Sequence, residues 1–151
     1  MAAWQFSVVL IPRGWAEENN NRVDLLYQKD GYVTGVAWAH WQPTVDFPGK
    51  VSKVLPESKS WHNSLLTWGN TLKHDIQIWY ENDLVESVCI RFSLRHKPEK
   101  LIGKVRLLAE DLNCVFFFPE TKAIENPTYN ILKSALINSN AAKFLIKSDG
   151  E

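Results

Sequence analysis

Two neighbouring stretches in the middle of the chain alternate between apolar and polar residues, and this pattern predicts a β-hairpin. In residues 75–80 the apolar residues take the even positions, and in residues 84–95 they do so from position 88 onward. Such alternation is typical of strands that bury one face. The intervening Glu81-Asn82-Asp83 supplies residues that tolerate the backbone of a hairpin loop. A three-residue loop would pair even with even positions and place both apolar sets on one face, so we expect residues 81–83 to form the loop.

Two later stretches carry apolar residues at spacings of three and four, which predicts two helices. The first covers residues 98–112, where Pro98 can occupy the first turn because its missing N–H is not needed there. The second covers residues 127–137 and follows Asn126, a residue suited to cap a helix. Each helix has one broad apolar stripe. We therefore expect both helices to pack on the apolar face of the hairpin.

Two short apolar runs predict interior strands. Residues 4–11 form the first run and residues 114–118 the second, and each is closed by a proline. Because neither run alternates, both faces of each strand should be buried. The two cysteines, Cys89 and Cys114, lie in strand-like segments, and we expect buried free thiols, as in a reducing cytosol. A bridge between neighbouring strands stays open, because the sequence does not give the Cα separation that it needs.

The segment from residue 13 to residue 56 is interrupted by asparagine, glycine and proline, and its signals are weak. Within it, Val36, Ala37 and Trp41 recur at helical spacing and should share one side. The chain has no repeat and no low-complexity linker. Together these patterns predict a single α+β domain over residues 1–151, built mainly on an antiparallel sheet with a central hairpin.

Charge and hydropathy narrow the classes of function. Lysine plus arginine equals aspartate plus glutamate, with 17 of each, which argues against a dedicated nucleic-acid binder. No apolar run approaches the roughly 20 residues that cross a bilayer, and the first residues do not have the pattern of a signal peptide. We therefore expect a cytoplasmic protein with no membrane or direct nucleic-acid partner. The oligomeric state stays open.

Residues with catalytic or metal-binding chemistry are scattered along the chain. The four histidines lack the spacing that would place two metal ligands on one helix face, and neither cysteine belongs to a CxxC motif. We expect no metal, no cofactor and no catalytic residue. Asp75 and Arg91 should approach each other diagonally on the polar face of the hairpin, where an exposed pair contributes about 0.2–1 kcal/mol.

The most distinctive feature of the composition is its seven tryptophans, because tryptophan is enriched where proteins bind other proteins. The expected partner-binding residues combine tryptophans with acidic residues of the hairpin and the loop before it: Trp61, Trp68, Asp75, Trp79, Glu81, Asp83 and Glu86. The acidic residues would complement a basic partner such as a nuclease domain. A solvated hairpin tip is the alternative. The polar face of the hairpin, with Gln77, Trp79, Cys89, Arg91, Ser93 and Arg95, is either covered by a second layer or exposed for recognition.

Several segments carry a resemblance over nearly the whole chain. They are FSVVLIPRGW near the N-terminus, Asp30-Gly31-Tyr32 followed by AWAHWQP, residues 58–70 from SKSW to WGN, DIQIWYENDLVESVCIRFSLR, and SNAAKF. In these segments the chain resembles small bacterial immunity-type proteins of polymorphic and contact-dependent toxin systems. The resemblance implies an α+β protein that binds and blocks a cognate toxin domain. Interface residues vary among such proteins, so the resemblance implies a role but no site residues.

Three functions follow from these observations. The leading hypothesis is an immunity-type protein that neutralises its cognate toxin by covering the toxin's active site. The second is a structural or adaptor subunit of a phage or secretion assembly. The third is an enzyme with a dispersed site built from Asp75, Arg91, Arg95 and a histidine. A toxin-domain gene, a structural-gene cluster or a metabolic operon beside the gene would favour the first, second or third hypothesis respectively.

Overall fold

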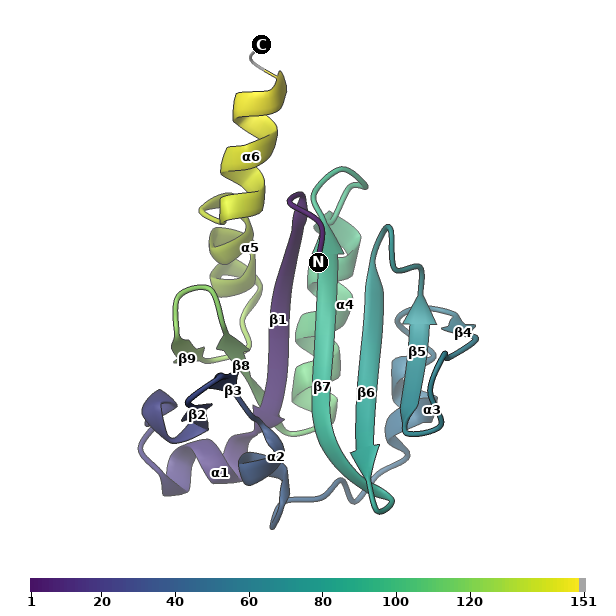
Figure 1. Ribbon diagram of the computed structural model, residues 1–151, viewed down its shortest axis with the longest axis vertical. Helices are drawn as coiled ribbons and strands as arrows, with labels where there is room; N and C mark the ends of the chain where they lie inside the picture. Colours follow the sequence, from purple (N-terminus) through teal and green to yellow (C-terminus); the bar gives the residue numbers. More distant parts are fainter. Residues whose placement is uncertain (150–151) are drawn as a thin grey trace.

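A seven-stranded antiparallel sheet forms the centre of the computed structural model, which describes residues 1–149 (Figure 1). Its strands are β1 (Gln5–Pro12), β4 (Glu57–Ser58), β5 (Leu65–Gly69), β6 (Asp75–Glu81), β7 (Leu84–Ser93), β8 (Cys114–Phe118) and β9 (Ala123–Glu125). Their order across the sheet is β4-β5-β6-β7-β1-β8-β9. A separate two-stranded sheet pairs β2 (Tyr27–Gln28) with β3 (Gly31–Tyr32).

The helices lie on both sides of this sheet. They are α1 (Arg13–Glu18), the 3-10 helix η1 (Val23–Leu26), α2 (Gly35–Trp38), α3 (Phe47–Val51), α4 (Glu99–Asp111), α5 (Tyr129–Ile137) and α6 (Asn140–Asp149). The α+β prediction with an antiparallel sheet is therefore confirmed. Within residues 1–149, no helix combines the length and the apolar character that crossing a membrane requires.

Strands β6 and β7 form the predicted hairpin, and its even positions pair with even positions. Ile76 lies opposite Ile90, and Ile78 lies opposite Val88. All four side chains are fully buried on the same face. The alternation of the sequence therefore located both strands and their apolar face.

The loop of this hairpin differs from the prediction of three residues. Glu81 pairs directly with Leu84, so only Asn82 and Asp83 form the turn, and both have positive φ angles, 51° and 65°. Two such residues are typical of the tight hairpin turn that matches the twist of its strands. A β-bulge follows, in which Glu86 is the extra residue. This extra residue restores the even pairing that a two-residue turn alone would have lost.

The turn and the bulge together move the pairing by two residues from the predicted register, and this changes the place of Asp75. It lies directly opposite Arg91, and its side chain is only 2% exposed. The expectation of a diagonal, exposed pair is therefore wrong. A buried ion pair depends much more strongly on having both partners than an exposed one does.

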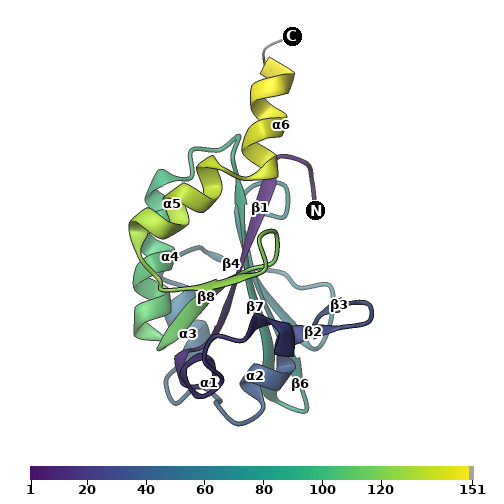
Figure 2. The same ribbon diagram turned by 90° about the vertical axis from the view of Figure 1, so that its left-hand side faces the viewer.

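Helices α4 and α5 cover the apolar face of the sheet, as predicted. Ile90 and Phe92 of β7 belong to one buried cluster with Leu101 and Val105 of α4 and Leu132 of α5. Figure 2 shows both helices on the same side of the sheet. This packing is the main core of the protein.

The start of α5 corrects the prediction of its cap. The hydroxyl of Thr128 accepts a hydrogen bond from the backbone N–H of Ile131 at 3.2 Å, and the helix begins at Tyr129. Asn126 is therefore not the capping residue. Threonine is also among the residues preferred at this position, although asparagine ranks above it, and Pro127 lies just outside the helix.

The opposite face of the sheet is covered only in part. Helices α1 and α2 and the β2–β3 pair lie over one end of β1, β7 and β8, whereas the remaining surface of β1, β7 and β6 carries no second layer (Figure 1). The covered end holds Val9, Ile11 and Phe117 under Trp15 and Leu26. Both alternatives for this face are thus partly realised: its end near α2 is covered by a second layer, and the rest has no second layer, although Asp75 and Ser93 are buried there.

The two cysteines lie on opposite faces of the sheet. Cys114 belongs to the main core, whereas Cys89 packs against the smaller cluster beneath α1 and α2. Both are free thiols, and burial raises the pKa of Cys89 to about 11 and that of Cys114 to about 12. A bridge between them is excluded, because the sheet separates their side chains.

The irregular segment contains the largest differences from the sequence predictions. Helix α2 is only four residues long, and it buries Ala37 and Trp38 while Val36 and Trp41 stay exposed. The expectation that Val36, Ala37 and Trp41 share one side is therefore wrong.

Outside this segment, strands β5 and β9, at or near the two edges of the sheet, were not predicted from the sequence.

Candidate functional site

The bulged end of the hairpin is attached to the segment around α2 by side-chain hydrogen bonds. The hydroxyl of Thr34 donates to the backbone carbonyl of Glu86, the extra residue of the bulge, at 2.9 Å. The amide of Gln42 donates to the carbonyl of Val85 at 2.9 Å and to that of Trp38 at 2.7 Å, and it accepts from the N–H of Val85 at 2.8 Å. These bonds hold α2 in a fixed position beside the hairpin turn.

Apolar side chains that no other part of the described chain covers gather where these two segments meet. Val33, Val36 and Leu84 line a hollow of about 330 Å³, and Val36 and Leu84 are 48% and 49% exposed. A second hollow shares Val33 and is lined by Tyr32 and Trp79. A third shares Val36 and includes Trp41. Because the hollows share residues, they form one continuous surface, here called the α2 surface: Tyr32, Val33, Val36, Trp41, Trp79, Glu81, Leu84 and Glu86.

The charged side chains of the α2 surface are acidic. Glu81 and Glu86 line its central hollow, and no lysine or arginine lines any of the three hollows within the described chain. Partial burial raises the pKa of Glu86, and the negative charge of Glu81 raises it further. A cation placed here would relieve the repulsion between the two carboxylates. The surface therefore suits a partner that presents apolar side chains next to a lysine or arginine.

The structure brings four of the seven predicted partner-binding residues together. Trp79, Glu81, Asp83 and Glu86 all lie at the turn end of the hairpin, and the half-buried ring of Trp79 lies 5.4 Å from that of His62. Trp61, which precedes His62 in the loop before β5, is 61% exposed. This part of the prediction describes a real surface, whose binding role stays a prediction.

The other two predicted residues are interior. Trp68 is fully buried in the main core, where its indole N–H donates to the hydroxyl of Ser52 at 2.9 Å. Asp75 is buried against Arg91. Neither side chain is available for direct contact with a partner. The sequence reasoning also missed Val33, Val36 and Leu84, because only their exposure in the folded chain distinguishes them from core residues.

Of the residues suggested for a dispersed enzyme site, Asp75 and Arg91 pair with each other, whereas Arg95 contacts Trp4. The two carboxylate oxygens of Asp75 accept hydrogen bonds from Arg91 at 2.7 and 2.6 Å, and one also accepts from Gln77 at 3.0 Å. The guanidinium of Arg95 lies over the ring of Trp4, 4.3 Å from its centroid. In the part of the chain that the structure describes, no group of three or more histidine, cysteine and acidic side chains could hold a metal ion.

Two histidines that are far apart in the sequence meet at the end of the hairpin away from its turn. The N–H of Ser93 donates to Nδ1 of His74 at 2.9 Å, so that nitrogen carries no proton. The other ring nitrogen of His74, Nε2, therefore donates to the carbonyl of His96 at 2.8 Å. The hydroxyl of Ser93 lies 2.6 Å from Nδ1 of His96, but Ser93 is fully buried and is not accessible to a substrate.

This arrangement predicts a loss of stability in mild acid. Burial lowers the pKa of His74. The hydrogen bond to the backbone carbonyl of His96 and the charge of Glu99 raise it, and the charge of the His96 ring lowers it, so the net shift is downward. The unfolded chain therefore binds this proton at a higher pH than the folded protein, and the free energy of unfolding should fall as the pH drops below about 6.5. Urea unfolding at pH 7.5 and pH 5.5 measures the difference. The His74→Gln variant should lose less stability than the wild type between these two values, and an equal loss would contradict the assignment.

Comparisons with known proteins add no identification. No protein-family model, no curated protein and no solved structure matches the chain.

Proposed function

We propose that this protein is an immunity-type inhibitor that binds a cognate toxin domain through the α2 surface and blocks the toxin's active site. The observation that carries the proposal is the apolar centre of this surface, formed by Val33, Val36 and Leu84 and bordered by Glu81 and Glu86. Exposed apolar side chains that are clustered and rimmed by polar groups are typical of protein-binding surfaces.

The rigidity of the surface supports the same proposal. The hydrogen bonds of Thr34 and Gln42 fix the α2 segment on the hairpin before any partner arrives. Binding then requires little ordering of the backbone, so more of the contact energy appears as affinity. The acidic rim would draw in a basic active-site groove, such as one that binds the phosphates of a nucleic acid.

The proposal predicts that an acidic residue at the apolar centre abolishes tight binding. Val36→Asp and Leu84→Asp should each weaken binding to the toxin domain by about 2 kcal/mol or more, roughly thirtyfold in Kd, because each buries an unpaired charge in the interface. The partner to use is the toxin domain encoded beside the gene. Titration calorimetry with purified proteins measures the affinity, and co-expression measures protection of growth.

A matched control is Leu72→Asp. Leu72 is exposed, and it lies in the loop that precedes β6, at the end of the hairpin away from its turn. This variant should bind and protect as the wild type does. Wild-type affinity in well-folded Val36→Asp and Leu84→Asp variants would contradict the proposed surface. Failure of the folded wild-type protein to bind or protect against the neighbouring toxin domain would contradict the proposed function.

A further inference from the structure

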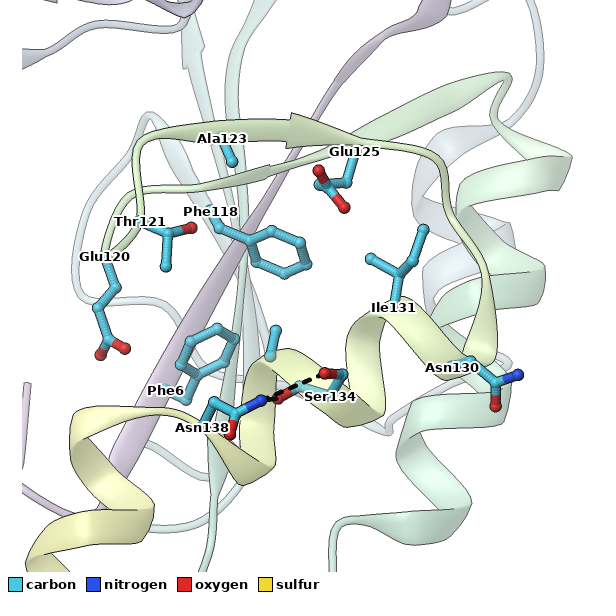
Figure 3. Close-up of a pocket in the computed structure, with 11 residues that line it drawn as sticks. Phe6, Phe118, Glu120, Thr121, Ala123, Glu125, Asn130, Ile131, Ser134 and Asn138 are labelled. Atoms are coloured by element: carbon cyan, nitrogen blue, oxygen red, sulfur yellow. Dashed lines mark hydrogen bonds between the residues drawn. The ribbon is translucent and has the colours of Figure 1, made fainter.

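A groove lies between α5 and the β8–β9 hairpin (Figure 3), and none of its lining residues belongs to the α2 surface. Its volume is about 450 Å³, and its apolar lining comes from Phe6, Phe118, Ile131 and Ala135. Glu120, Thr121 and Glu125 also line it. Within residues 1–149 no lysine or arginine contributes to this lining. We call it the α5 groove.

Helix α6 begins at the rim of the α5 groove and extends away from the body of the protein (Figures 1 and 2). Its first turn is well anchored. The hydroxyl of Ser139 accepts a hydrogen bond from the N–H of Ala142 at 3.1 Å, and the carboxylate of Glu120 accepts one from the N–H of Asn140 at 3.2 Å. The groove residue Asn138 immediately precedes the helix. The direction of α6 is therefore fixed relative to the groove.

Beyond its first turn, α6 presents apolar and basic side chains to solvent. Phe144 is exposed, Ile146 is 73% exposed, and Lys143 and Lys147 are exposed as well. Phe144 and Lys147 are three residues apart, so they lie on one face of the helix. This face combines an aromatic ring with a positive charge, whereas the α5 groove combines an apolar floor with negative charge.

A chain cannot bring its own α6 into its own groove without a break at the Ser139 cap, because the helix points away from it. We propose that α6 of a second copy of this chain occupies the α5 groove, with Phe144 on the apolar floor and Lys147 beside Glu125. The groove and the helix each occur once per chain. In the proposed dimer the exchange is reciprocal: it fills both grooves and closes with two-fold symmetry, whereas a head-to-tail contact would grow into a filament.

Charge complementarity identifies the second copy as the occupant, and a charge exchange tests it. One variant, Lys143→Glu with Lys147→Glu, has an acidic helix and an acidic groove. The other, Thr121→Lys with Glu125→Lys, keeps Glu120 at the start of α6 and has a basic helix and a groove of net positive charge. Each variant alone faces like charges in both contacts, so its self-association should be at least about tenfold weaker than that of the wild type.

A mixture of the two variants should recover the dimer. Both contacts of the mixed dimer then pair opposite charges, the acidic helix with the basic groove and the basic helix with the acidic groove. Sedimentation velocity at low salt measures each variant alone and the equimolar mixture. Weakened association of each alone with recovery in the mixture supports the proposal, and a mixture no more associated than the separate variants overturns it.

The apolar part of the contact has its own test. Phe144→Asp should also weaken self-association at least about tenfold, whereas Leu107→Asp, at an exposed leucine of α4, should leave it unchanged. Neither substitution removes a buried side chain, and circular dichroism checks that each variant is folded. The proposal would be overturned if the wild-type protein stayed monomeric at a concentration 100-fold above the low micromolar range. Equal effects of the two substitutions on self-association would also overturn it.

Discussion

The Asp75→Ala variant is expected to unfold with a free energy about 3–5 kcal/mol lower than that of the wild type. Asp75 accepts two hydrogen bonds from the guanidinium of Arg91, and the side chains are only 2% and 18% exposed. Removing the carboxylate leaves the arginine largely buried with no negative partner. The pair also joins β6 directly to β7, so its loss affects the hairpin that carries the α2 surface.

Urea unfolding at neutral pH measures this effect, with Glu81→Ala as the matched control. Glu81 lies on the same strand as Asp75 but is exposed, so its replacement should change the free energy of unfolding by less than about 0.5 kcal/mol. If Asp75→Ala lost less than about 1 kcal/mol of unfolding free energy, the assignment of a buried, stabilising Asp75–Arg91 ion pair would be contradicted.

The Trp68→Ala variant should be destabilised by about 3–5 kcal/mol, because it leaves a large cavity in the main core. It also removes the hydrogen bond from the indole N–H to Ser52. Trp61→Ala, which changes an exposed residue, should keep the free energy of unfolding within about 0.5 kcal/mol of the wild type. Chemical denaturation of the two variants in parallel measures the contrast, and similar losses would contradict the placement of these two tryptophans.

The sequence predicted the hairpin strands and helices α4 and α5 because their patterns are local. Alternation in β6 and β7 and the stripes of α4 and α5 depend only on which face each residue presents. The loop of the hairpin shows the limit of this reasoning. A two-residue turn with a bulge at Glu86 gives the same even pairing as a three-residue loop, so parity alone cannot distinguish them. The difference moved Asp75 from a diagonal position to one opposite Arg91.

The sequence predicted only the part of the candidate site that depends on a local pattern. The acidic residues and Trp79 follow from the hairpin and could be placed from the sequence. The apolar centre could not, because Val33 and Val36 lie in an irregular segment whose position depends on the hydrogen bonds of Thr34 and Gln42 to residues more than 40 positions away. Strand β9 has only three residues, which is too short for a periodic pattern.

Amide hydrogen exchange of the protein, free and bound to the toxin domain encoded beside its gene, tests the proposed binding surface most directly. We expect binding to slow exchange in residues 32–42 and 79–87, which form the α2 surface and the hairpin turn, and to leave α4 unchanged. No variant is needed, so the result does not depend on the folding of a mutant. A complex in which these two segments exchange as fast as in the free protein, while another face is protected, would contradict the account.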